Sequence, residues 1–275
     1  MKQIPPLLLI SLFFVIASCQ EEDTVSDLAA STDGSKQASE ATLYTRINGH
    51  PVPLVKRGDY YVADGDIIVD LDSEGITGSS ESSRTAGVGV TPESLLWPNG
   101  VIPYEFSSTM SENERTWVKQ IMDNIEYYTK VRFREANNDS DYIVISDGGA
   151  AGESKIGRQG GGQIVRVPTM GERPVLGALH ELFHVIGLNH EQTRLDRDEH
   201  LIVDSSVLLN SDYFKSSSRT YEDYYEFDFN SIMLYSSFKD GRVVMRKKNG
   251  DTFGGYQSQS WFSWNDVYTV RAMYP

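Results

Sequence analysis

The sequence contains a single cysteine, Cys19, among 275 residues. A disulfide framework within the folded part is therefore excluded, and stability must come from a buried core, which a chain of this length can form. Basic residues are also few, with 25 Lys and Arg against 39 Asp and Glu and a formal net charge of −14. A surface that binds phosphates needs clustered positive charge, so we expect no nucleic acid partner.

Histidine is equally scarce, and three of the five histidines are His180, His184 and His190. Residues four apart on a helix leave the same face, so His180 and His184 are placed to bind one ion. Gly187 permits a sharp turn that returns His190 towards them. Three imidazoles with one position left open are typical of catalytic zinc, whereas histidines in an ordinary core need no such spacing. The pattern predicts one Zn²⁺ per chain.

Two further features indicate the chemistry of this ion. Glu181 lies about 100° around the helix from His180, within reach of a water at the metal, and is the predicted general base. The extended pattern H-E-x-x-H-x-x-G-x-x-H is followed by Ser231 to Tyr235, which resembles the methionine turn of metzincin proteases. We expect Met233 to lie beneath the metal as a hydrophobic platform and not as a ligand.

The N-terminal residues 1–19 are typical of an export signal. Lys2 precedes an apolar run that is too short for a permanent membrane helix and ends in Ala17-Ser18-Cys19. This end resembles a bacterial lipobox, which predicts lipidation of Cys19 and an outer-membrane or cell-surface lipoprotein, with release to the extracellular space left open. An ordinary signal peptide with an incidental cysteine is the alternative. The polar residues 20–42 are expected to form a flexible tether.

Residues 43–86 differ in composition from the tether before them. Two strand-like runs, Tyr60-Tyr61-Val62 and Ile67-Ile68-Val69, flank the turn sequence Asp64-Gly65-Asp66. A linker-like stretch rich in Ser, Gly and Thr follows and contains Arg84. A small structured segment and a cleavable linker ahead of a large domain suit a zymogen. We therefore interpret residues 43–86 as an inhibitory prosegment with its linker and residues 87–275 as the protease domain.

Within the large domain, capping and periodicity predict the main elements. Ser111 with Glu114 forms a capping box for a helix whose apolar face carries Trp117, Ile121, Ile125 and Tyr128. Pro174 is placed to begin the histidine helix and Gly187 to end it. Ser263 with Asp266 predicts a final helix through Met273. Strands are predicted near residues 97–104, 131–135, 142–146 and 163–167.

From about Trp97 to Tyr274 the chain resembles the astacin metalloproteases. The resemblance is carried by residues 97–104, 156–163, 180–194 with Asp196-Arg197-Asp198, and the methionine turn at 231–235. It implies an α+β metzincin fold with two lobes. A mixed sheet and the active-site helix would form the upper lobe, and the loop-rich lower lobe would hold a C-terminal helix.

The sequence departs from the family pattern at several positions. Lys130 and Gly152 stand where half-cystines are expected, and Leu234 replaces a commoner histidine. The resemblance implies that Tyr235 binds zinc at rest and swings to stabilise the reaction intermediate; a tyrosine that only braces the turn is the alternative. It also implies that an aspartate in Phe-x-Gly-Asp inhibits the zymogen as a zinc ligand. Asp66 matches this aspartate although Ala63 replaces the phenylalanine, and a plain hairpin turn is the alternative.

The resulting hypothesis is a monomeric zinc endopeptidase that is exported as a zymogen and acts on protein or peptide substrates. Its contact with a membrane would be limited to a lipid anchor at Cys19. Two rivals remain open: a surface lipoprotein that binds a host or matrix protein through a vestigial zinc site, and a peptidase for bacterial cell-wall peptides.

Overall fold

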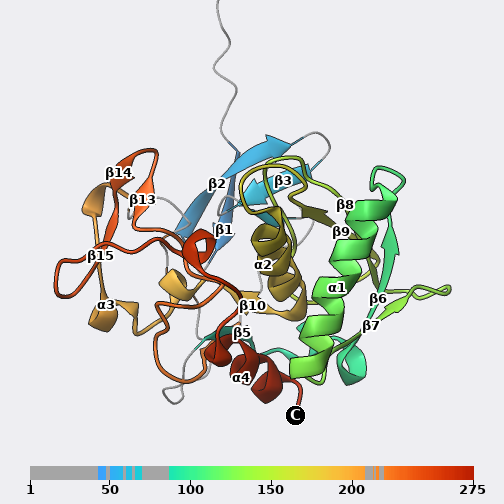
Figure 1. Ribbon diagram of the computed structural model, residues 1–275. Helices are drawn as coiled ribbons and strands as arrows, with labels where there is room; N and C mark the ends of the chain where they lie inside the picture. The colour runs from blue at the N-terminus through green and yellow to red at the C-terminus, as the bar shows by residue number, and fades with distance from the viewer. Residues whose placement is uncertain are drawn as a thin grey trace, which may run out of the picture. The chain divides into compact units, whose positions relative to one another are not determined.

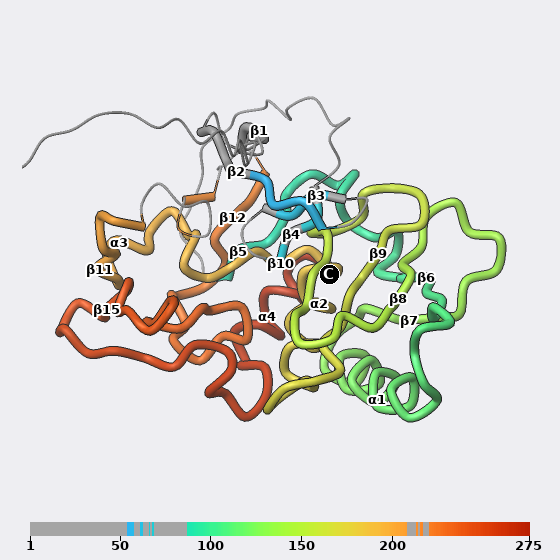
Figure 2. Tube along the Cα trace, turned by 90° about the horizontal axis from the view of Figure 1, so that it is seen from above, coloured from blue at the N-terminus to red at the C-terminus, as the bar shows by residue number. Residues whose placement is uncertain are grey.

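The helix that carries the first two histidines lies at the centre of the fold. It is α2, Pro174–Ile186, and its C-cap Gly187 has a φ of 125°, so both predicted ends are confirmed. Every residue of α2 from Leu176 to Ile186 is buried, as expected for a helix whose residues are mostly apolar. Figure 1 shows α1 and a sheet on one side of α2 and the segment that contains α3 and β13 to β15 on the other. Figure 2 shows the same division from above.

The computed structural model describes residues 43–47, 50–57, 60–63, 66–69, 87–207, 213, 215–216 and 220–275. The chain divides into two units, Met1–Glu40 and Ala41–Pro275. The predicted export signal with Cys19, the tether, the linker at 70–86 and the turn residues Asp64 and Gly65 lie outside the described residues. Within the described part of the chain, none of the helices has the length and apolar character needed to cross a bilayer.

One side of α2 is covered by a four-stranded sheet and a long helix. The four strands are all parallel, in the order β7-β6-β8-β9, and Glu153 forms an isolated antiparallel bridge with Arg166 of β9 outside the named strands. Their bounds are β6 Val101–Phe106, β7 Arg132–Glu135, β8 Tyr142–Asp147 and β9 Gly162–Val167. The predicted first strand therefore begins later than Trp97, because Pro98–Gly100 forms a 3₁₀ turn in which Asn99 has a φ of 55°.

Helix α1, Glu112–Tyr128, begins with the predicted Ser111–Glu114 capping box. Its buried face differs in part from the predicted one. Ile121 and Ile125 are buried as expected, but Val118 and Met122 complete the buried face, while Trp117 and Tyr128 are only partly covered. Trp117 packs against the edge of the main core, whereas the Tyr128 ring lies edge-on to those of Phe262 and Trp264.

The other side of α2 consists of short strands, loops and a second core. Strand β5, Val88–Val90, lies between β10, Leu188–Asn189, and β12, Tyr221–Asp223. The remaining elements are α3 Arg197–His200, β11 Leu201–Val203, β13 Phe238–Lys239, β14 Arg242–Val243, β15 Met245–Lys247 and α4 Trp264–Met273. The 3₁₀ turns are η1 Glu93–Leu95, η2 Pro98–Gly100, η3 Glu191–Thr193, η4 Ser205–Val207 and η6 Tyr256–Ser258. Helix α4 starts with the predicted Ser263–Asp266 capping box.

The buried C-terminal end of α2 is held by groups from distant parts of the chain. The Trp97 indole donates to the carbonyl of Val185 at 2.8 Å, and the Tyr274 hydroxyl donates to that of Ile186 at 2.7 Å. The last carbonyls of a helix have no intrahelical partner, so burial requires such donors. These bonds fix the helix against both ends of the large domain.

The predicted prosegment forms a sheet of its own. Its strands are antiparallel in the order β1-β2-β3-β4, with bounds β1 Leu43–Ile47, β2 His50–Arg57, β3 Tyr60–Ala63 and β4 Ile67–Val69. The predicted hairpin between residues 60–62 and 67–69 is confirmed by the pairing of β3 with β4. Asp66 stands immediately before β4 and is therefore positioned by this hairpin.

Candidate metal centre

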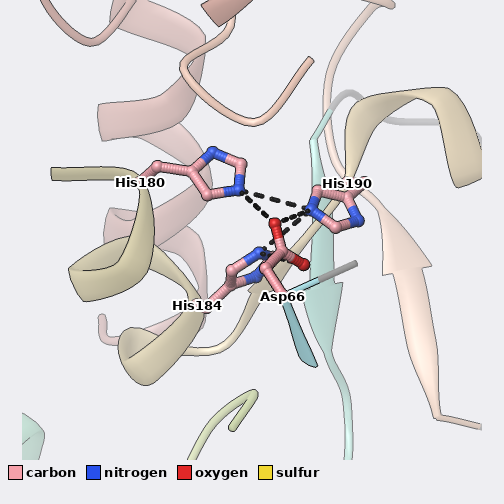
Figure 3. Close-up of side chains that lie close together, drawn as sticks. All are labelled: Asp66, His180, His184 and His190. Carbon is pink, nitrogen blue, oxygen red and sulfur yellow. Dashed lines mark hydrogen bonds and ion pairs between the residues drawn. The ribbon is translucent and has the colours of Figure 1, made fainter. Parts of the chain in front are cut away.

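Figure 3 shows the side chains of His180, His184, His190 and Asp66 directed at a common centre. Their ligand atoms all lie within 4.8 Å of one another, and all four residues are buried. The first two histidines belong to α2, His190 follows β10, and Asp66 comes from the segment 124 residues before His190. The structure thus brings the three predicted ligands together with the carboxylate that the family resemblance singled out.

The spacing of these atoms fits one zinc ion. His190 Nε2 lies 3.3 Å from His180 Nε2 and 3.1 Å from His184 Nε2. Zinc–nitrogen bonds of about 2.0–2.1 Å at tetrahedral angles separate two ligand nitrogens by about 3.3–3.4 Å. Asp66 Oδ2 is likewise 3.3 Å from both His180 Nε2 and His190 Nε2. Three imidazoles and one carboxylate oxygen therefore form a four-coordinate donor set for zinc.

Backbone carbonyls fix the orientation of two of the imidazoles. His180 Nδ1 donates to the Ile232 carbonyl at 2.7 Å, and His184 Nδ1 donates to that of Leu188 at 2.8 Å. A carbonyl can only accept, so each Nδ1 carries the proton and each Nε2 presents a lone pair to the centre. Burial, together with the neighbouring His180, holds the pKa of His184 well below its usual value, which favours the neutral form that metals bind.

The Asp66 carboxylate also contacts the phenol that the resemblance assigns to catalysis. The Tyr235 hydroxyl donates to Asp66 Oδ2 at 2.7 Å. Burial raises the pKa of Asp66, but the adjacent His190 and the nearby His180 and His184 outweigh this effect, so the pKa lies well below its ordinary value. Asp66 is therefore an anion in this site, the form that coordinates zinc.

Glu181 lies beside this cluster and lines the same cavity as Asp66 and Tyr235, which has a volume of about 480 Å³. Its carboxylate oxygen Oε2 accepts a hydrogen bond from the Ser154 hydroxyl at 2.7 Å. Burial and the nearby Asp66 charge raise the pKa of Glu181 well above its ordinary value. A carboxylate with a raised pKa at the wall of a cleft is a suitable proton acceptor from water.

The methionine turn is anchored by the cap of α4. Asp266 accepts hydrogen bonds from the Ser231 hydroxyl at 2.7 Å and from the Ile232 amide at 3.0 Å. The carbonyl of the same Ile232 orients His180, so a single residue connects the cap of α4 with the metal ligand. Met233 is buried in the main core, and Leu234 is buried in the second core, where an apolar side chain fits.

Three contributors to the site were not identified from the sequence. Tyr256 stacks on the His180 ring with centroids 4.5 Å apart. Ser154 bonds to Glu181, and Arg57 of β2 lies 3.4 Å from the Glu153 carboxylate. None of these residues has a diagnostic spacing, because each comes from a segment far from the histidine motif.

Comparison with known proteins agrees with this site. The family model described as Astacin, a peptidase family, matches residues 89–275. Bone morphogenetic protein 1 of Xenopus laevis is 36% identical over 146 residues, which are 51% of this chain and 20% of that protein. Astacin-like metalloprotease toxin 1 of Loxosceles intermedia is 32% identical over 185 residues, 64% of this chain and 67% of that protein. The chain thus spans about a fifth of the length of the first of these relatives.

Solved structures show the same fold. The high choriolytic enzyme 1 of Oryzias latipes (medaka), a hatching enzyme zinc-protease, is similar with a TM-score of 0.57 and 25% identity over 67% of this chain and 96% of that one. Myroilysin has a TM-score of 0.51 and 20% identity over 69% and 98%. The predicted α+β metzincin fold and the predicted zinc cofactor are confirmed. The chain belongs to the astacin family of zinc metalloendopeptidases.

Proposed function

We propose that residues 87–275 form a protease domain in which His180, His184 and His190 hold one zinc ion and Glu181 and Tyr235 carry out peptide-bond hydrolysis. The observation that carries this proposal is the convergence of three Nε2 atoms: that of His190 lies 3.3 Å from that of His180 and 3.1 Å from that of His184, and carbonyls set the tautomers of His180 and His184. Three protein nitrogens leave a fourth position for chemistry once Asp66 is removed.

The roles of the residues follow from their chemistry. Zinc in such a site supplies Lewis acidity, which makes water more acidic and polarises a carbonyl. Glu181 takes the proton of the attacking water and delivers it to the leaving amine. The Tyr235 hydroxyl donates to the carbonyl oxygen as negative charge develops there. Met233 contributes an apolar floor, because its side chain is buried in the core.

We also propose that residues 43–69 inhibit the enzyme before processing, with Asp66 as the latch. A carboxylate at the fourth ligand position excludes the water that Glu181 would activate. The same oxygen, Oδ2, accepts the Tyr235 hydroxyl and so occupies the donor for the oxyanion. Two backbone hydrogen bonds to Ser154 and the ion pair between Arg57 and Glu153 support docking of the segment.

For the rest of the chain, we propose that residues 1–19 direct export and that Cys19 carries a lipid anchor ahead of the tether at 20–42. Astacin proteases are typically secreted, which agrees with export. The substrates are proteins, and we propose that the enzyme acts as a monomer. Sequencing the amino terminus of the mature enzyme, together with mass analysis of the Cys19 peptide, tests this part. An unmodified Cys19 in the exported protein would refute the anchor.

Proteolysis itself is tested with the full chain. Limited trypsin digestion in the stretch that contains Arg84 should release the prosegment, after which a serine-protease inhibitor blocks the trypsin. We expect casein hydrolysis that is lost on treatment with 1,10-phenanthroline, returns with Zn²⁺, and accompanies one zinc per chain by elemental analysis. Activity that survives chelation would contradict the proposal. Absence of activity on casein but release of fragments from peptidoglycan would favour the cell-wall alternative, and inactivity on both would favour a binding protein.

A further inference from the structure

Ser154 is a fully buried residue at the edge of the cleft, and each of its polar groups contacts a different partner. Its hydroxyl donates to Glu181 Oε2 at 2.7 Å. Its amide donates to the Asp66 carbonyl at 2.7 Å, and its carbonyl accepts from the Ile68 amide at 2.8 Å. Ser154 therefore connects the backbone at Asp66 and Ile68 with the carboxylate that is next to the metal centre.

The segment that carries Ser154 is itself held firmly. The neighbouring Glu153 exchanges two backbone hydrogen bonds with Arg166 of β9, at 3.0 and 2.8 Å. This pairing ties Ser154 to the edge of the four-stranded sheet, so its hydroxyl has a defined position relative to α2. A hydroxyl on a paired strand is a better anchor than one on a free loop.

Gly152 gives the Glu181 carboxylate the room that it occupies. A Cβ at position 152 would collide with Glu181 Oε1. The family resemblance predicts a half-cystine at this position, which would have filled that space. The carboxylate therefore lies between the Ser154 hydroxyl on Oε2 and a residue without a side chain beside Oε1.

We propose that Ser154 is a positioning residue for the general base: its hydroxyl holds Glu181 in the orientation that receives the proton of the attacking water. This inference rests on the proposed role of Glu181. A glutamate has several rotatable bonds, and a hydrogen bond from a buried hydroxyl to a carboxylate is strong enough to select one rotamer. One oxygen is thereby fixed and the other remains for proton transfer.

The hydroxyl of Ser154 and its backbone groups have different partners, so their effects can be separated. Ser154→Ala removes the hydroxyl but keeps the amide and carbonyl that bond the chain in the cleft. An effect on orientation of the base lowers kcat, whereas an effect on binding raises KM. Loss of a hydrogen bond to a charged group corresponds to a reduction in kcat of about tenfold or more.

The experiment uses the full chain activated by limited proteolysis, as parent and as the variants Ser154→Ala, Ser154→Thr and Ser146→Ala. Ser146 is the matched control, a buried serine of β8 whose hydroxyl bonds to the Val165 carbonyl, away from the cleft. We expect Ser154→Ala to lose about tenfold in kcat with KM within about twofold of the parent. Ser154→Thr, which keeps a hydroxyl, should recover most of this loss, and Ser146→Ala should leave kcat unchanged.

Zinc content and thermal unfolding are measured for every variant. One zinc per chain and an unchanged Tm in Ser154→Ala assign the loss of kcat to the base. A parental kcat in Ser154→Ala overturns the inference, and so does a loss that appears only in KM or only together with loss of zinc. If Ser154→Thr does not fold, comparison of kcat and KM between Ser154→Ala and Ser146→Ala still tests the inference. An inactive parent refutes the proposed function instead, so the two failures are distinguishable.

Discussion

The ligands at the metal centre come from two regions that are held in different ways. His180 and His184 belong to α2, a fully buried helix whose final carbonyls accept hydrogen bonds from Trp97 and Tyr274. Asp66 directly precedes β4 of a separate four-stranded sheet, whose named strands pair with one another among the described residues. That sheet contacts the protease domain through the Ser154 backbone and through Arg57, whose side chain is 52% exposed.

This difference indicates how one centre can be both permanent and regulated. Removing His180 or His184 from the site requires unfolding of the core, because the helix that carries them is part of that core. Removing Asp66 requires only undocking of a small sheet. In the proposed mechanism, the carboxylate takes the ligand position and the tyrosine that the reaction needs, so its departure would open the site.

The largest effect is expected from a substitution on the buried helix α2. Glu181→Ala in the activated enzyme should lower kcat by about 1,000-fold, because no other group would accept the proton of the attacking water. Zinc should remain at one per chain by elemental analysis, since the histidines are unchanged. Glu199→Ala, which removes an exposed carboxylate of α3, is the control. Retention of activity in Glu181→Ala would remove this residue from the mechanism.

Tyr235 connects the two regions, because it lies in the proposed protease domain and its hydroxyl donates to Asp66. In the activated enzyme, Tyr235→Phe should lower kcat by about 100-fold with little change in KM, since the oxyanion loses a donor. Steady-state kinetics with a fluorogenic peptide measure both constants. An unchanged kcat would support the alternative that the tyrosine only braces the turn.

The latch itself is tested in the unprocessed chain. Asp66→Ala should raise peptide hydrolysis by about 10- to 100-fold, because a charge-assisted contact to the centre is lost while the rest of the prosegment remains. Asp64→Ala, which removes the other carboxylate of the same Asp-Gly-Asp sequence, should have no such effect. Equal activity of the two variants would mean that the block lies elsewhere in the prosegment.

The smallest effect is expected from the docking ion pair. Arg57→Ala should raise the activity of the unprocessed chain by at most about fivefold, because a half-exposed ion pair contributes little. The exposed neighbour Lys56 provides the matched variant, Lys56→Ala, with no expected change. The rise should shrink at high salt, which screens the pair. A rise as large as that of Asp66→Ala would show that docking, not ligation, dominates inhibition.

Several parts of the fold could be predicted from the sequence because they depend on interactions between neighbouring residues. The capping boxes at Ser111 and Ser263 and the Pro174 and Gly187 boundaries of α2 are confirmed, since caps satisfy backbone groups within a few residues. The buried face of α1 was predicted only in part. Aromatic residues at helical spacing indicated the right side of the helix, but which residues reach the centre depends on the partner surface.

The contacts of Asp66 show where local reasoning ends. The sequence allowed both a hairpin turn and a zinc ligand, and these two readings are compatible in the structure. Asp66 directly precedes β4, and its carboxylate lies beside the histidines. The turn depends on neighbouring residues, whereas the contact between Asp66 and His190 joins residues that are 124 positions apart in the sequence.

By itself, the sequence determined the zinc-binding pattern, the base next to it and the methionine turn, because a helix of regular pitch converts spacing along the chain into direction in space. Only the tertiary structure decided that Ser154, Tyr256 and the Arg57–Glu153 pair belong to the same site. Their positions depend on how the sheet edge, the η6 turn and the prosegment pack around α2. Contacts between segments that are distant in the sequence produce no periodic pattern from which they could be predicted.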